Sequence, residues 1–168
     1  ISEKEDGVAF VNEILPMTPS QYILQKVAIG FLFGSLSSVA TACICFRLSW
    51  QNWGMMLALI VLSSFVAALI GLFIGKLSEG LMTGVVHIKL VMLLFLAVPL
   101  LCALIGVSGP PAVMCNIVPS QPAFDGIMAL SAGNMGTAVK DAGILAVHCI
   151  AWFVLYILLF SRRSQQAM

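Results

Sequence analysis

The sequence predicts an all-α membrane protein with four transmembrane helices, and its composition carries that prediction. Of 168 residues, 61% are hydrophobic and only 9% are charged, whereas a typical soluble domain carries about 25% charged residues. So few charged side chains do not cover a water-soluble globule of this size. The net charge of +1 gives no reason to expect nucleic acid as a partner. We therefore expect residues 1–168 to form a single membrane domain in contact with a lipid bilayer.

Four long apolar runs supply the predicted spans. A helix needs about 20 mostly apolar residues to cross about 30 Å of hydrocarbon, and none of the four runs contains Asp, Glu, Lys or Arg. Basic residues or interfacial Trp and Tyr residues flank the runs, as is typical of the headgroup level. The predicted spans are residues 27–46, 54–75, 90–107 and 144–160.

The distribution of Lys and Arg predicts the orientation. With both termini in the cytoplasm, the segments on the inside carry most of the basic residues, which satisfies the positive-inside rule. The inside residues are Lys4, Lys26, Lys76, Lys89, Arg162 and Arg163, against Arg47 and Lys140 outside. We expect a multi-pass protein of the plasma (inner) membrane with both termini cytoplasmic.

The residues before the first span have their own pattern. Residues 2–15 predict a cytoplasmic amphipathic helix, because Ser2 and Glu5 have capping-box spacing and an apolar stripe follows them. Pro16 ends this helix. Thr18 and Pro19 then begin a second helix that is expected to continue through the first span to Phe46.

Residues 108–143 form the predicted external segment. Pro110, Pro111, Pro119 and Pro122 interrupt it, and the stretches between them are too short to cross a bilayer. Irregular backbone at membrane depth survives where it is buried in protein or faces water. The Pro-rich segment is therefore expected to form a re-entrant or interfacial hairpin before the last span.

The sequence contains no recognisable catalytic machinery. Gly71 to Lys76 lacks the glycine spacing and the Ser or Thr of a nucleotide-binding loop, and no Cys and His spacing typical of zinc sites occurs. The five cysteines are interpreted as small packing residues, and their odd number predicts no disulfide framework. We expect no catalytic residue, no metal site and no cofactor in this chain.

Two patterns within the spans are candidates for function. His148, Trp152 and Tyr156 follow one another at four-residue steps, so they share one helix face. They form either part of a substrate path or a hydrogen-bonded packing stripe. Gly30 and Gly34 form a GxxxG pair, which allows close helix packing either with a partner span or second subunit or within this chain.

The start of the chain resembles a known family signature. The run Glu3-Lys4-Glu5-Asp6-Gly7 is followed by Leu15-Pro16, Pro19-Ser20, Tyr22-Ile23-Leu24 and Lys26. This order resembles the cytoplasmic signature of ABC type-2 exporter permeases, the transmembrane subunits of ATP-driven exporters. Asp6 and Val8 depart from the usual residues around Gly7. The family's four following spans, with a Pro-bearing external hairpin before the last, are similar to the layout predicted here.

The resemblance implies a partner and a mode of action. In such permeases the amphipathic helix is a coupling helix that docks on a separate ATPase subunit. This implies coupling positions at Glu3, Lys4, Glu5, Gly7, Pro16 and Lys26. Members normally have two further spans before this motif, so the chain is expected to correspond to the C-terminal half of a permease.

The expected function is therefore outward transport of an amphipathic drug, lipid or peptide. The expected partners are an ABC ATPase subunit and a second permease copy or homologous half that completes a dimer. The alternative is a self-contained four-helix membrane scaffold or small channel that has no ATPase partner.

Overall fold

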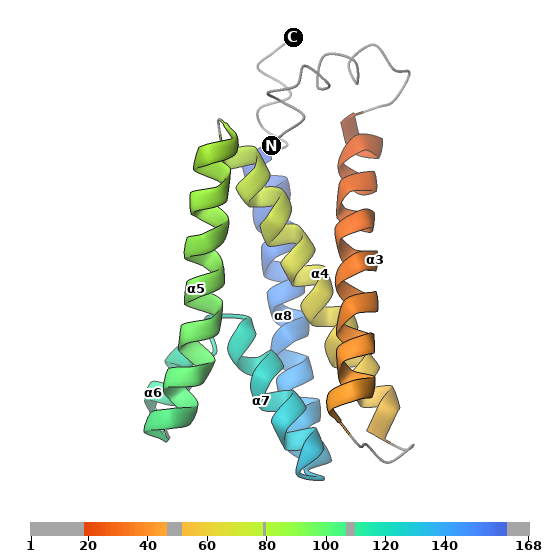
Figure 1. The fold of residues 1–168 in the computed structure, drawn as a ribbon, viewed down its shortest axis with the longest axis vertical. Coiled ribbons are helices and arrows are strands. Elements are labelled where there is room, and N and C mark those ends of the chain that lie inside the picture. Colours follow the sequence, from red (N-terminus) through yellow and green to blue (C-terminus); the bar gives the residue numbers. More distant parts are fainter. Residues whose placement is uncertain (1–18, 47–51, 79, 107–109, 161–168) are drawn as a thin grey trace.

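The computed structural model describes residues 19–46, 52–78, 80–106 and 110–160, and its elements are all helices (Figure 1). Among the described residues, four helices are long and apolar enough to cross a membrane. This confirms the predicted fold class of an all-α protein with four membrane-spanning helices. The helices are α3 (Pro19–Cys45), α4 (Trp53–Leu77), α5 (Leu81–Ile105), α6 (Pro110–Cys115), α7 (Ser120–Ser131) and α8 (Met135–Phe160). The predicted amphipathic helix over residues 2–15 lies outside the described residues.

Helix α4 is the centre of the described structure. Of its most apolar 18-residue window, 39% is buried, against 6% for α3, 6% for α5 and 11% for α8. Helices α3 and α5 lie on the two outer sides, with α4 and α8 between them (Figure 1). The large exposed apolar surfaces of α3 and α5 suit contact with lipid, which is as apolar as the side chains themselves.

The four long helices alternate in direction. The start of α3, the turn between α4 and α5, and the end of α8 lie at one end of the bundle (Figure 1). The end of α5, helix α6 and the turn between α7 and α8 lie at the opposite end. This arrangement places residues 19 and 160 at the same end.

Two helices begin earlier than the predicted spans because capping residues set their starts. Helix α5 begins at Leu81, where the backbone N–H of Gly80 donates to Thr83 Oγ1 at 3.1 Å. Helix α8 begins at Met135, and Asn134 Oδ1 accepts the backbone N–H of Thr137 at 3.2 Å. A side-chain oxygen at this position satisfies an otherwise unpaired helix amide. Part of the predicted external segment is therefore the first turns of α8.

The segment before α8 turns back along the bundle. Helix α6 lies beside the last turns of α5, and α7 descends beside α8 after the turn at residues 116–119 (Figure 1). The carbonyl oxygen of Ile117 lies 3.1 Å from Nε2 of His148. His148 is about 20 Å along α8 from Met135 at 1.5 Å per residue. The turn therefore reaches the middle of α8, while the depth of this segment in a bilayer stays a prediction.

Candidate functional site: a hydroxyl-lined pocket between α3, α4 and α7

Two glycines set the distance between α3 and α4. A Cβ atom added at Gly30 would lie 3.7 Å from Cβ of Ala68, and one added at Gly34 would lie 3.7 Å from Cβ of Ser64. Both glycines therefore face α4, where small residues let the two backbones approach. The rings of Phe31 and Phe65 pack edge to face nearby, with centroids 6.3 Å apart. The GxxxG pair makes its contact within this chain.

Next to this contact, the small side chains of α3 and α4 leave a pocket of about 280 Å³, which Gly34 and Ser64 help to line. A second pocket of about 220 Å³ shares Ser38 and Ser63 with the first. Residues with hydroxyl groups from three helices line these pockets, and none of the described residues that line them is charged. The hydroxyl-bearing residues are Ser37, Ser38 and Thr41 of α3, Ser63 and Ser64 of α4, and Ser120 of α7.

Some of these hydroxyls are already engaged and others are available. Ser63 Oγ donates to the carbonyl of Ile60 at 3.1 Å, and Thr41 Oγ1 donates to the carbonyl of Ser37 at 2.9 Å. Ser120 Oγ is buried and has no hydrogen-bond partner among the described residues. An uncharged pocket that combines hydroxyls with apolar walls offers hydrogen bonds and dispersion contacts.

The predicted stripe of α8 lies elsewhere. His148, Trp152 and Tyr156 are half-buried on one side of α8, but none of them lines either pocket. Nδ1 of His148 lies 2.9 Å from the carbonyl oxygen of Ile144, and its Nε2 faces Ile117.

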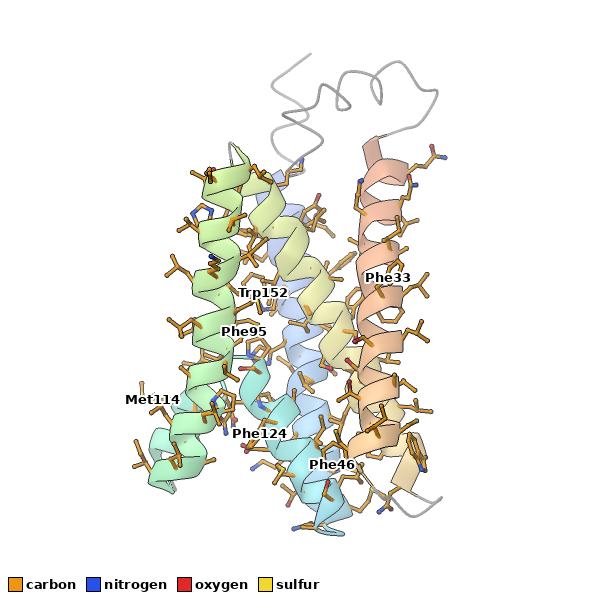
Figure 2. The ribbon with its side chains drawn as sticks, viewed as in Figure 1. Phe33, Phe46, Phe95, Met114, Phe124 and Trp152 are labelled. Carbon is orange, nitrogen blue, oxygen red and sulfur yellow. The ribbon has the colours of Figure 1, made fainter. Side chains whose placement is uncertain are left out.

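Trp152 belongs to a separate apolar cluster. Its ring packs edge to face on Phe73 of α4, with centroids 6.0 Å apart. Together with Phe95 it also packs against buried residues of α4 and α8 (Figure 2). The buried residues of this cluster are Val66, Ile70, Ile74 and Cys149.

A polar cluster between α7 and α8 was not predicted from the sequence. Asp141 is buried with 6% of its surface exposed, and Gln121 is buried with 5% exposed. Gln121 Nε2 donates to Asp125 Oδ2 at 2.8 Å, whereas Asp141 Oδ2 makes no hydrogen bond within the described residues. Asn134 is the residue from which this cluster was predictable. An N-cap at Asn134 places Asp141 within α8 rather than in a loop.

The predicted coupling positions are mostly outside the described residues. Glu3, Lys4, Glu5, Gly7 and Pro16 fall in residues 1–18, which the structure does not describe. Lys26 lies in α3 and is half-buried. Among the residues described, no group of three or more His, Cys, Asp or Glu side chains is arranged to hold a metal ion.

Comparison with known proteins identifies the family of the chain. Neither the curated proteins nor the solved structures gave a match. The family described as ABC-2 family transporter protein matches residues 1–158, which is nearly the whole chain. This confirms the resemblance that the residues between Glu3 and Lys26 indicated. The protein is a multi-pass membrane protein with the permease role of its family, and the chain belongs to the ABC-2 family of transporter proteins.

Proposed function

We propose that the chain is the membrane subunit, or the C-terminal portion of one, of an ATP-driven exporter. The observation that carries this proposal is the family match over residues 1–158. Residues 1–168 contain no nucleotide-binding loop, and in this proposal an ABC ATPase subunit hydrolyses the ATP. In the plasma (inner) membrane, with both termini cytoplasmic, Glu3, Lys4, Glu5 and Gly7 lie on the side where that ATPase binds. A second permease copy or homologous half completes the translocation path.

The cargo is an amphipathic drug, lipid or peptide, moved outward. The uncharged pockets support this class, because hydroxyl-lined apolar surfaces bind neutral amphipathic molecules without stranding a charge in the membrane. The pockets also touch α7, so a molecule bound there contacts both the α3–α4 pair and the segment before α8. A movement of α7 relative to α3 and α4 therefore changes the shape of the cargo site.

Charge reversal at the predicted coupling helix tests the ATPase partnership. The double variant Glu3→Lys, Glu5→Lys is expected to lose most of the ATPase that co-purifies with the wild-type chain, because reversing charges at an interface disrupts its electrostatic complementarity. Recovery is measured by quantitative immunoblotting of membranes solubilised in mild detergent. Glu79→Lys is the control, because it introduces the same kind of charge reversal on the predicted cytoplasmic side outside the coupling helix.

The two outcomes separate the proposal from its alternative. If the double variant and the control retain equal amounts of ATPase, the coupling assignment is wrong. If the wild-type chain recovers no ATPase from membranes in which one is co-expressed, a self-contained four-helix scaffold or small channel becomes the better description.

A further inference from the structure

Cys102 of α5 and Cys115 of α6 lie in contact near the end of α5. Cys102 lies in the last turn of α5 and Cys115 is the last residue of α6. Their Sγ atoms are 2.6 Å apart, although thirteen positions separate them in the sequence. Both side chains are half-buried, whereas Cys149 is buried in the apolar cluster around Trp152. The other two cysteines, Cys43 and Cys45, lie near the end of α3.

The backbone around each cysteine is held by hydrogen bonds. The N–H of Gly106 donates to the carbonyl of Cys102, and Gly106 itself takes the left-handed conformation with φ 65° that ends α5. A left-handed residue at this position is usually glycine, because it has no Cβ to clash. The N–H of Val118 donates to the carbonyl of Cys115 at 3.1 Å. Backbone hydrogen bonds therefore define both of the helix ends that bring the two sulfurs together.

From this juxtaposition we propose that Cys102 and Cys115 form a disulfide in the membrane-inserted protein. The proposal rests on the orientation of the proposed function, which places the end of α5 and helix α6 at the external end of the bundle. Disulfides form and persist outside the cytoplasm, where the compartment is oxidising. Both side chains are half-buried, and Cys102 lies in the last turn of α5, so the two sulfurs lie near the end of the bundle at which an external oxidant acts.

The chemistry is a dithiol–disulfide exchange with an external protein or small-molecule disulfide. The thiolate of one cysteine attacks the oxidant's disulfide and forms a mixed disulfide, releasing the first oxidant thiol. The second cysteine then displaces the remaining oxidant thiol and forms the Cys102–Cys115 bond. Two chain thiols are oxidised and one oxidant disulfide is reduced to two thiols. The Cys102–Cys115 disulfide joins the last turn of α5 covalently to the end of α6. It thereby anchors the start of the segment between α6 and α8.

Counting free thiols in protein that has never been reduced tests the proposal. Membranes are quenched in acid, denatured in detergent and treated with a maleimide–polyethylene glycol reagent that adds one mass step per thiol. The chain contains five cysteines, so the disulfide leaves three steps before reduction and five after it. Cys102→Ser and Cys115→Ser are each expected to show four steps whether or not the sample is reduced. Cys43→Ser is the matched control, with two steps before reduction and four after it.

Two outcomes would overturn the disulfide. One is five steps in the never-reduced wild-type chain. The other is three steps in the wild-type chain with only two in never-reduced Cys102→Ser and Cys115→Ser, since another pair is then linked. After a five-step result, an added thiol oxidant identifies the cause. Closure to three steps means that the sulfurs meet but face the reducing side, so the proposed orientation is wrong. Absence of closure means that the sulfurs do not meet. Co-purification of the ATPase with Cys102→Ser tests the proposed function independently of this bond.

Discussion

At the scale of single residues, His148 connects two parts of the chain that are distant in sequence. Its Nε2 faces the carbonyl of Ile117 at 3.1 Å, and its Nδ1 faces the carbonyl of Ile144 at 2.9 Å. A neutral imidazole has one N–H, so it donates to one of these two carbonyls at a time. With the proton on Nε2, the side chain donates to the Ile117 carbonyl and holds the turn at residues 116–119 against the middle of α8.

Removing this side chain is expected to loosen the turn. In His148→Ala the Ile117 carbonyl loses its partner, and a hydrogen bond of this kind contributes about 1 kcal/mol. The amides of Asn116, Ile117 and Val118 are therefore expected to exchange with deuterium about fivefold faster. Exchange is measured by mass spectrometry of the chain in reducing detergent buffer, so that the cysteine pair does not restrain the turn. His148→Gln retains an N–H donor and is expected to restore part of the protection. Equal exchange in His148→Ala and the wild-type chain would show that the contact does not hold the turn.

At the scale of elements, helix α7 is wedged between α4 and α8 at a single glycine. A Cβ added at Gly126 would lie 3.0 Å from Cδ2 of Leu59 and 3.3 Å from Cβ of Asp141. Leu59 is fully buried, with 0% of its surface exposed, so it has little room to move. The close approach of the three helices therefore depends on the absence of a side chain at this position.

The variant Gly126→Ala is accordingly expected to destabilise the bundle. Overpacking of this kind costs about 1–3 kcal/mol, which outweighs the gain of up to about 1 kcal/mol in helix propensity. The melting temperature in detergent, followed by size-exclusion chromatography of heated samples, is expected to fall by several degrees. Gly143→Ala is the control, because nothing lies within 4 Å of a Cβ added there. A Gly126→Ala protein as stable as the control would mean that α7 is not tightly packed.

At the scale of the whole molecule, the pockets lie where three helices meet. Ser38 of α3 and Ser63 of α4 line both pockets, and Ser120 of α7 lines the larger one. Helix α3 packs mainly against α4, and only 6% of its span window is buried. The pockets therefore depend on how α3 and α7 are held against α4, and not on the sequence of one helix.

Filling the pockets is expected to impair transport without removing the ATPase partner. A ring at Ser38 occupies space in both pockets, so Ser38→Phe is expected to lower ATP-dependent uptake of an amphipathic fluorescent dye into inverted vesicles several-fold. Ala40→Phe adds the same ring at an exposed position of α3 that lines neither pocket, and uptake is expected to stay near the wild-type value. The amount of ATPase recovered with each variant is measured in the same membranes. Equal uptake by the two variants would exclude the pockets from the cargo path.

The sequence by itself determined the membrane class, the four spanning helices and the family. Transfer of a segment from water to lipid depends on its own side chains, so the uncharged run from residue 54 to residue 75 predicts a span whatever packs against it. The family signature between Glu3 and Lys26 is likewise a local pattern, and the match over residues 1–158 agrees with it. Helix limits were less predictable, because Gly80 and Asn134 begin their helices before the apolar runs start.

Only the tertiary structure decided which faces meet. In lipid a leucine is equally well placed against a neighbouring helix and against an acyl chain, so hydrophobicity does not distinguish the buried face of α4 from its exposed face. The pockets around Ser38, the contact of His148 with Ile117, and the meeting of Cys102 with Cys115 join residues from different helices or turns. Each depends on how the helices pack in three dimensions, and spacing along the chain does not encode it.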